Sequence, residues 1–500
     1  MNTSELLHLD AAPQTAAATV PVGVAPPNDP AITGITADSR QVQPGFLFAA
    51  LRGSATDGRH FAGEAVAKGA VAILTDDPAA LMLDEATRSR VAIIADANPQ
   101  RLLALAAARF YPARPATIAA VTGTNGKTSV AHFTREIWQA LGYQSASLGT
   151  LGWVVGDERQ PGALTTPDPV ALHRTLSELA GRGVSHAAIE ASSHGLAQYR
   201  LDGLSVAAAA FTNLTRDHLD YHGDMDAYRA AKERLFTALL EPAGTAVLNA
   251  DSREFNHLAA AARQRTQSVV AYGTAAEADL RIVARQPRRD GQRVSLALNG
   301  EPHDVELKLI GGFQAMNVLA ALGLVLATGG RMKDAIAALP LLSTVPGRMQ
   351  LVGEINGATV FVDYAHTPDA LATALAAARP HTERRLAVVF GAGGDRDRGK
   401  RPLMGEVTTA NADIVYVTDD NPRSENAAAI RREILAAAPG AIEIGDRRAA
   451  ICTAIGALCA GDVLIIAGKG HETGQVVGRE TLPFDDAVVA RAALAERVGR

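Results

Sequence analysis

Cysteine and aromatic residues are scarce in this chain. Of its 500 residues, 2 are cysteines, Cys452 and Cys459, and 4% are aromatic. Two cysteines exclude a disulfide framework as the basis of the fold, and they exclude a metal cluster built on CxxC pairs. We expect both thiols to be buried and reduced. Because aromatic side chains are few, we expect a mainly aliphatic core.

Long apolar runs and an excess of basic charge are also missing. The longest apolar runs, such as residues 318–327, are too short to span a bilayer, and the first 30 residues lack the pattern of a secretion signal. The formal net charge is −5, whereas broad nucleic-acid binding usually needs a basic face. We therefore expect a cytoplasmic enzyme with no membrane span and no nucleic-acid partner.

The length predicts about three domains, at roughly 100–200 residues per domain. Residues 1–28 are rich in Ala, Pro, Thr and Val without periodicity, which indicates a mobile, disordered extension. Proline-containing segments at 111–115 and 344–348 are typical of boundaries. The predicted domains are an N-terminal domain over 29–112, a central domain over 113–343 and a C-terminal domain over 344–500.

Apolar runs of strand type alternate with helical segments in the second and third domains. This alternation is typical of a mainly parallel sheet wrapped by helices, so the predicted fold class is α/β. The predicted strands are 117–121, 186–189, 206–211, 245–248, 359–362, 386–390, 414–417 and 463–466, and the smaller first domain adds 46–51, 71–75 and 91–95. Many of these strands end in polar residues, where open parallel sheets bind ligands, which predicts two sites that face one cleft.

The most informative loop reads TGTNGKTS over residues 122–129, after a predicted strand and before a helical pattern that starts near Val130. Glycines let backbone N–H groups curl around an anion, Lys127 adds a positive charge, and the hydroxyl of Thr128 suits Mg²⁺. The common motif GxxxxGK[ST] needs glycine where this chain has Val121, so the loop is shorter. A glycine-rich turn with an exposed lysine is the alternative. The predicted phosphate ligands are Gly123, Thr124, Asn125, Gly126, Lys127, Thr128 and Ser129.

This shortened GTNGKT resembles the ATP loop of the Mur ligase superfamily, which includes the folylpolyglutamate synthetases. Other motifs spread over about residues 35–485 resemble the same family: DSR at 38–40, TTP at 165–167, EASSHGL at 190–196, DHLD at 217–220, AK at 231–232, DNPR at 420–423 and GKGHE at 468–472. The resemblance implies a small α/β uridine-binding domain, a central P-loop ATPase-like domain and a Rossmann-like C-terminal domain.

A carboxylate and a γ-phosphate repel each other, so ATP-driven amide formation needs cations to bring them together. Glu190 is a suitable Mg²⁺ ligand by its chemistry, and His218 is a less usual one; a capping glutamate and a hydrogen-bonded histidine are the alternatives. The resemblance implies that both hold a second Mg²⁺ and that Lys232 is carbamylated, although composition alone favours a solvated lysine. Lys127, Lys232 and His218 are the predicted catalytic residues.

The resemblance also implies further ATP contacts and two substrate sites. Asn317 resembles the asparagine that contacts adenine in the family. Arg348 is expected to contact the phosphates of ATP, and Asp363 is expected to contact the ribose. Gln314 occupies a position where the family often has asparagine. The DNPR motif resembles that of family members that use diaminopimelate, an amino acid with one carboxylate more than lysine. The guanidinium of Arg423 could bind this extra carboxylate through two parallel hydrogen bonds. The residues expected to bind diaminopimelate are Arg396, Asp420, Asn421, Pro422, Arg423, Gly468 and Glu472. Those expected to bind the nucleotide-sugar dipeptide are Ser39, Thr165, Thr166, Ser192, Gln198 and Arg200.

The resemblance therefore predicts a monomeric ligase that uses ATP to join meso-2,6-diaminopimelate to UDP-N-acetylmuramoyl-L-alanyl-D-glutamate. ATP is expected to bridge the central and C-terminal domains. Two other classes of protein stay open. A folylpolyglutamate-type ligase would need neither the uridine domain nor Arg423. A regulatory P-loop NTPase would hydrolyse ATP without an amino acid.

Overall fold

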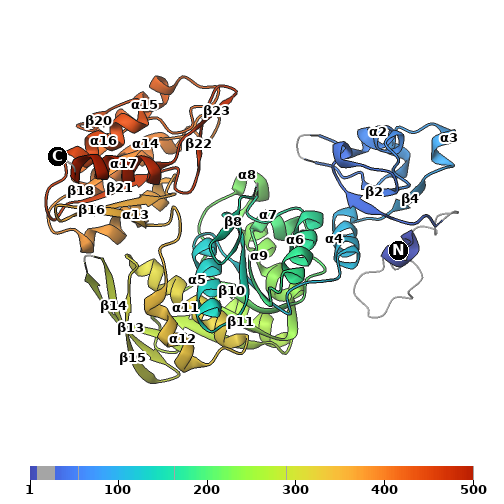
Figure 1. Cartoon of the computed structure of the whole chain (residues 1–500), viewed down its shortest axis with the longest axis horizontal. Helices are drawn as coiled ribbons and strands as arrows, with labels where there is room; N and C mark the ends of the chain where they lie inside the picture. The colour runs from blue at the N-terminus through green and yellow to red at the C-terminus, as the bar shows by residue number, and fades with distance from the viewer. Residues whose placement is uncertain (8–28, 54–55, 163, 289, 499–500) are drawn as a thin grey trace. The chain divides into compact units, whose positions relative to one another are not determined.

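The computed structural model describes residues 1–7, 29–53, 56–162, 164–288 and 290–498 (Figure 1). The chain forms two compact units. The first comprises Met1–Lys127, Trp138–Val270 and Leu324–Gly329, and the second comprises Thr128–Ile137, Ala271–Gly323 and Gly330–Arg500. Among the described residues, no helix is both long enough and apolar enough to cross a membrane.

The first unit begins with a four-stranded parallel sheet in the order β1-β2-β3-β4. Its strands are β1 (Gly34–Thr36), β2 (Phe46–Ala49), β3 (Ala72–Thr75) and β4 (Ala92–Ala95), with helices α2 (Ala62–Ala67), α3 (Glu85–Arg88) and α4 (Pro99–Phe110). The expectation of a mobile extension over 1–28 is wrong for its first residues, because α1 (Thr3–Leu7) buries Leu6 and Leu7 in the core of this sheet. Residues 8–28 lie outside the described residues.

The rest of the first unit contains strands that pair in the order β11-β10-β5-β9-β6-β7-β8. The pairs from β11 to β6 are parallel, and β7 and β8 add an antiparallel edge. These strands are β5 (Thr117–Thr122), β6 (Ser145–Gly149), β7 (Gly152–Val155), β8 (Glu158–Gln160), β9 (His186–Glu190), β10 (Val206–Phe211) and β11 (Leu240–Asn249). The parallel strands confirm the α/β prediction, and their carboxyl ends place the loops that carry the candidate site.

Helices follow most of these strands. They are α5 (Lys127–Ala140), α6 (Pro169–Gly181), α7 (Ser193–Ala197), α8 (Leu219–His222), α9 (Met225–Arg234) and α10 (Phe255–Gln264). Helix α5 begins at Lys127, three residues before the predicted start near Val130, so Lys127 lies in the first turn, where free backbone N–H groups favour an anion.

The second unit contains the last residues of β12 (Ser268–Gly273) and an antiparallel meander of β13 (Leu280–Arg288), β14 (Gly291–Leu298) and β15 (Glu301–Leu307). This meander was not predicted, and most of β13 is exposed. Helices α11 (Gly312–Ala327) and α12 (Met332–Ala338) follow.

The last sheet has the order β16-β17-β21-β18-β19-β20 and is parallel except at β16. Its strands are β16 (Gln350–Ile355), β17 (Ala358–Asp363), β18 (Leu386–Phe390), β19 (Ile414–Val417), β20 (Ile442–Glu443) and β21 (Val463–Ala467). A hairpin of β22 (Gly474–Val477) and β23 (Glu480–Pro483) follows, and the helices are α13 (Pro368–Ala378), α14 (Lys400–Asn411), α15 (Ala427–Leu435), α16 (Arg447–Gly456) and α17 (Asp486–Val498). Aliphatic cores form on this sheet.

Cys452 and Cys459 are exposed, so the expectation of buried thiols is wrong.

Candidate active site

The loop between β5 and α5 requires its glycines. Gly123 has φ +146° and Gly126 has φ +90°. Residues other than glycine rarely adopt these backbone angles. A Cβ atom at Gly123 would lie 1.9 Å from the hydroxyl oxygen of Thr212, the residue after β10. The N–H of Thr124 donates to the carbonyl of Asn213 (2.8 Å). The segment after β10 therefore fixes the shape of the phosphate loop.

Two lysines converge on this loop. Nζ of Lys127 donates to the carbonyl oxygens of Gly123 (3.0 Å) and Thr124 (2.8 Å). Nζ of Lys232, in α9, donates to the carbonyl of Gly123 (2.8 Å), and the Lys232 side chain is buried. Burial and the nearby Lys127 charge lower the pKa of Lys232 well below its usual value. The solvated lysine that composition favours is therefore not observed.

Tyr228 joins helix α9 to the same loop, although no sequence motif pointed to it. Its hydroxyl lies 3.1 Å from the hydroxyl of Thr124, and its ring centroid lies 4.4 Å from Nζ of Lys232. Burial raises the pKa of Tyr228 to about 12. The spacing of Tyr228 and Lys232, four residues apart in a helical pattern, places both on one face and was the available signal.

Glu190 lies at the end of β9, paired with Val121 of β5, and it is buried. Its carboxylate accepts hydrogen bonds from the N–H (2.8 Å) and the hydroxyl (3.1 Å) of Thr150, whose hydroxyl lies 3.1 Å from that of Thr165. His218 has φ +52° and its ring centroid lies 4.8 Å from that of His194.

The predicted metal ligands are Thr128, Glu190, His218 and Lys232, and two of them, Glu190 and His218, are histidine or acidic residues. Within the described parts of the chain, no group of three or more His, Cys, Asp or Glu residues is arranged to hold a metal ion. The carboxylate of Glu190 and the hydroxyl of Thr128 are nevertheless hard oxygen donors, which fit Mg²⁺. His218 and Lys232 therefore stay predictions as ligands.

Most of the residues expected to bind the nucleotide-sugar dipeptide form one network around Thr166. The Thr166 hydroxyl donates to the carbonyl of Glu190 (2.8 Å) and accepts from the N–H of Ser192 (3.0 Å). Arg200 donates to the carbonyl of Thr166 (2.7 Å) and to Oε1 of Gln198 (2.6 Å). Ser39 lies apart from this network, in the short helical turn after β1.

The residues expected to contact ATP in the second unit are connected through Gln314. Its Oε1 accepts from Nδ2 of Asn317 (3.0 Å), and its Nε2 donates to the carbonyl of Arg348 (3.2 Å). The guanidinium of Arg348 lies over the ring of Tyr364 (4.5 Å). The carboxylate of Asp363 accepts from the N–H groups of residues 349 and 365, and burial raises its pKa.

Of the residues expected to bind diaminopimelate, all but Arg396 lie in the segments that follow β19 and β21. Asn421 donates from Nδ2 to Oε2 of Glu472 (3.0 Å), and Nη1 of Arg423 donates to the carbonyl of Gly394 (2.8 Å). Oδ2 of Asp420 lies 2.5 Å from where a Cβ atom at Gly468 would stand, so only glycine fits there without displacement. Pro422 accepts from the N–H of Glu425 (3.1 Å), and Arg396 is exposed.

The sequence matches the Mur ligase middle domain over residues 121–325, the Mur ligase glutamate ligase domain over 347–470 and the Mur ligase family catalytic domain over 31–111. A UDP-N-acetylmuramoyl-L-alanyl-D-glutamate–2,6-diaminopimelate ligase of Bradyrhizobium diazoefficiens is 55% identical over 93% of this chain and 96% of its own. The chain belongs to the Mur ligase family. The ligase of the same name from Caulobacter vibrioides is 52% identical, again over 93% of this chain and 96% of its own.

A solved structure of a diaminopimelate ligase shows the same fold as this Mur ligase. It has a TM-score of 0.67 and 34% identity, and it covers 93% of this chain and 95% of its own. The α/β architecture inferred from the alternating strand and helix patterns is therefore that of the family.

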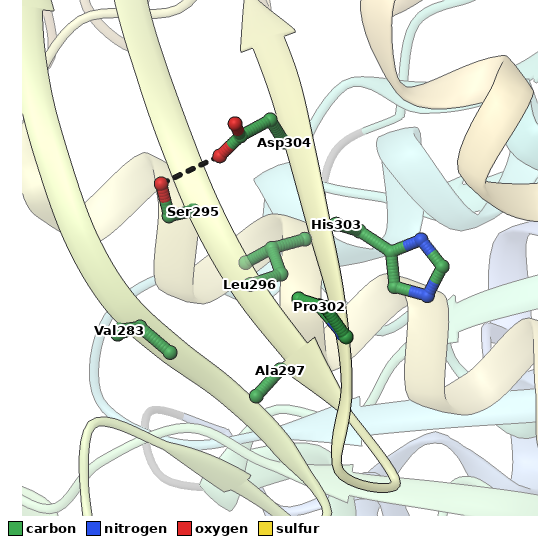
Figure 2. A pocket seen from close by; sticks show the side chains of 7 residues that line it. All are labelled: Val283, Ser295, Leu296, Ala297, Pro302, His303 and Asp304. Carbon is green, nitrogen blue, oxygen red and sulfur yellow. Dashed lines mark hydrogen bonds between the residues drawn. The ribbon is translucent and has the colours of Figure 1, made fainter.

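This Mur ligase also has a hollow outside the predicted site. A cavity of about 280 Å³ lies on the antiparallel meander, where the hydroxyl of Ser295 donates to Asp304 (2.6 Å), as Figure 2 shows. None of the predicted site residues lines it. Its lining residues are Val283, Ser295, Leu296, Ala297, Pro302, His303 and Asp304.

Proposed function

We propose that this chain is the ATP-dependent ligase that adds meso-2,6-diaminopimelate to UDP-N-acetylmuramoyl-L-alanyl-D-glutamate during peptidoglycan precursor synthesis. The observation that carries the proposal is that the loop after β19, which contains Arg423, also binds the Glu472 carboxylate through Nδ2 of Asn421 (3.0 Å). An amino acid with an extra carboxylate and a distal ammonium needs both groups. The names of the curated relatives support the same substrate.

The reaction follows from the charges at the phosphate loop. An oxygen of the D-glutamate γ-carboxylate attacks the γ-phosphorus of ATP, and ADP leaves. The amine of diaminopimelate then attacks the acyl carbon of the acyl phosphate, loses a proton, and phosphate departs as the amide forms. Lys127 and the N–H groups of the loop offset the charge that builds on the phosphates. Asn317, Arg348 and Asp363 are the proposed contacts to the rest of ATP.

Thr128 and Glu190 are proposed to hold Mg²⁺, which would offset further phosphate charge. We also propose that Lys232 is carbamylated and that His218 completes the ligand set. The lowered pKa of Lys232 supports this because only a neutral amine adds to CO₂, with loss of a proton, to give a carbamate. Native mass spectrometry of the intact protein kept in bicarbonate should show an added mass of about 44 Da, that of one CO₂, which Lys232→Met removes. Its absence would contradict the carbamate.

The domain bounds 29–112, 113–343 and 344–500, a cytoplasmic location and a monomeric state are parts of the same proposal. The three family segments lie inside these bounds. ATP and nucleotide-linked precursors are substrates available in the cytoplasm. Light scattering of the purified chain tests the monomer, and a dimer would contradict it.

Phosphate release with each substrate omitted in turn tests the activity. Release should require the UDP-dipeptide and diaminopimelate together, and it should be much slower with lysine in place of diaminopimelate. ATP hydrolysis that needs no amino acid would indicate a regulatory NTPase. Activity with a folate and glutamate would indicate a folylpolyglutamate-type ligase.

A further inference from the structure

Lys469 is a buried cation in the loop that follows β21. Its side chain has 0% of its surface exposed. Its Nζ donates to Oδ1 of Asn421 (2.9 Å) and to Oε2 of Glu472 (3.0 Å). Removing an ammonium group from water is unfavourable unless a carboxylate and hydrogen bonds compensate for the lost hydration. The charge of Lys469 therefore acts inside the domain, on these two side chains.

The contacts of Lys469 fix how Asn421 and Glu472 are oriented. Oδ1 of Asn421 accepts from Lys469 and from the N–H of Val476 (2.9 Å), while Nδ2 donates to Oε2 of Glu472. An amide whose oxygen faces two donors and whose nitrogen faces a carboxylate has one favourable orientation. Both bonds to Glu472 use Oε2, and its side chain is 34% exposed. Oε1 takes part in neither bond.

We infer that Lys469 is a positioning residue of the amino-acid site, which holds the Glu472 carboxylate so that Oε1 receives the distal ammonium of the incoming diamino acid. The inference rests on the proposed function. It adds a residue, Lys469, that does not contact the substrate but holds the Glu472 carboxylate in the position at which it binds the substrate.

The same framework also holds the arginine that selects the extra carboxylate. The N–H of Arg423 donates to the carbonyl of Val476 (3.0 Å), and its carbonyl accepts from the N–H of Gly478 (2.8 Å). Val476 is also the residue whose N–H binds Asn421. The network of Lys469, Asn421 and strand β22 therefore connects Arg423 with Glu472. These are the two residues proposed to bind the extra carboxylate and the distal ammonium of diaminopimelate.

Lys469→Met removes the charge and keeps an unbranched side chain that is one atom shorter. We expect the KM for diaminopimelate to rise roughly tenfold to hundredfold, the effect of losing one charge-assisted hydrogen bond, while the KM for ATP stays unchanged. Lysine and diaminopimelate share the distal ammonium, so the ratio of their kcat/KM values should not change. Arg423→Ala, in contrast, should lower the preference for diaminopimelate. Lys469→Arg keeps the charge, so it should raise the KM less, and it serves as the test variant if Lys469→Met does not fold.

Arg385→Met is the matched control. Arg385 pairs with the buried Asp462 (2.6 Å) at the beginning of β21, whereas Lys469 follows the end of this strand. Arg385→Met removes a cation from a buried carboxylate at the other end of the same strand. It should lower the thermal midpoint of unfolding without a selective rise in the KM for diaminopimelate. A selective rise in this control would show that general loosening of the sheet, not positioning, accounts for the Lys469 effect.

A double-mutant cycle with Glu472→Gln decides whether Lys469 acts through Glu472. In the Glu472→Gln background, Lys469→Met should add little to the KM for diaminopimelate. A full additional effect in that background, or an unchanged KM in both Lys469 variants, would overturn the inference. The wild-type assay is read first. If wild type shows no phosphate release that depends on diaminopimelate, the proposed function fails, whereas an active wild type with unaffected variants contradicts only the role of Lys469.

Discussion

Lys127 and Lys232 donate hydrogen bonds to one acceptor, the carbonyl oxygen of Gly123. Burial of Lys232, together with the repulsion from Lys127, lowers the pKa of Lys232. A phosphate is a stronger acceptor than a backbone carbonyl because its hydrogen bonds are charge-assisted. We therefore expect a triphosphate to draw Lys127 away from its own loop, which relieves the repulsion between the two lysines.

Lys232→Met should flatten the pH dependence of stability. The pKa of Lys232 is lowered in the folded chain, while the unfolded lysine keeps its ordinary value of 10.5. Between these two pKa values the unfolded chain binds more protons than the folded chain. The free energy of unfolding contributed by Lys232 therefore rises with pH across this window. Urea unfolding of wild type and variant in CO₂-free buffer over a pH series measures the difference.

Lys333→Met, at an exposed lysine in α12, is the control for that experiment and should unfold with the wild-type pH dependence. Parallel pH curves for wild type and Lys232→Met would mean that Lys232 has the same proton affinity in the folded and unfolded chain. That result would contradict its burial beside Lys127.

Tyr228→Phe should weaken ATP binding more than diaminopimelate binding. The variant keeps the buried ring beside Lys232 and loses the hydroxyl that lies 3.1 Å from Thr124. One such hydrogen bond contributes about 1 kcal/mol, so we expect the KM for ATP to rise roughly fivefold. Because burial raises the pKa of Tyr228 to about 12, its hydroxyl stays protonated and the effect should be the same from pH 7 to about pH 9.

Tyr416→Phe is the matched control, since Tyr416 is a buried tyrosine in β19 of the second unit. It should leave the KM for ATP at the wild-type value. If Tyr228→Phe also leaves this KM unchanged, the hydroxyl pair does not shape the phosphate loop.

The parallel strands could be predicted because a strand buried on both faces reads as a continuous apolar run. Strands β10, β18 and β19 have the predicted bounds. The antiparallel meander could not be found in this way, because β13 is exposed over most of its length and its sequence lacks such a run. The cysteine prediction failed for a similar reason. Cys452 lies beside Ile451 in α16, and the helical period turns it away from the buried face.

The sequence motifs predicted which residues belong to the candidate site, but they did not predict which of these residues contact one another. The sequence placed Lys127 and Lys232 in separate motifs, and their shared contact with Gly123 depends on the register of β5 and β10. In the sequence, Lys469 is distinguished only as one residue of the GKGHE motif, because a single sequence does not show that a lysine is fully buried. Burial of charge follows from tertiary packing, and this is why Tyr228 and Lys469 emerged only from the structure.

Gly123→Ala should abolish ligation and destabilise the chain. The new Cβ atom would stand 1.9 Å from the Thr212 hydroxyl, and the residue has φ +146°. Strained backbone of this kind costs about 1–3 kcal/mol, and the clash adds to it. Gly183→Ala separates the two effects, because Gly183 also has a positive φ (+86°) but a Cβ atom there meets nothing within 4 Å. Thermal unfolding and phosphate release measure both variants. A fully active Gly123→Ala enzyme would contradict the loop geometry.

Arg423→Ala should remove the preference for diaminopimelate over lysine. Arg423 has φ +51° and is held by backbone bonds to the β22–β23 hairpin, and alanine leaves these bonds available, so the loop should keep its course. The KM for diaminopimelate should rise roughly tenfold to hundredfold, because one charge-assisted contact to a carboxylate is lost, while the KM values for lysine and ATP stay the same. Arg398→Ala is the control, since the Arg398 side chain is 66% exposed and pairs with Glu433; it should change none of these values. Equal losses for diaminopimelate, lysine and ATP would show that Arg423 supports the loop rather than the extra carboxylate of the substrate.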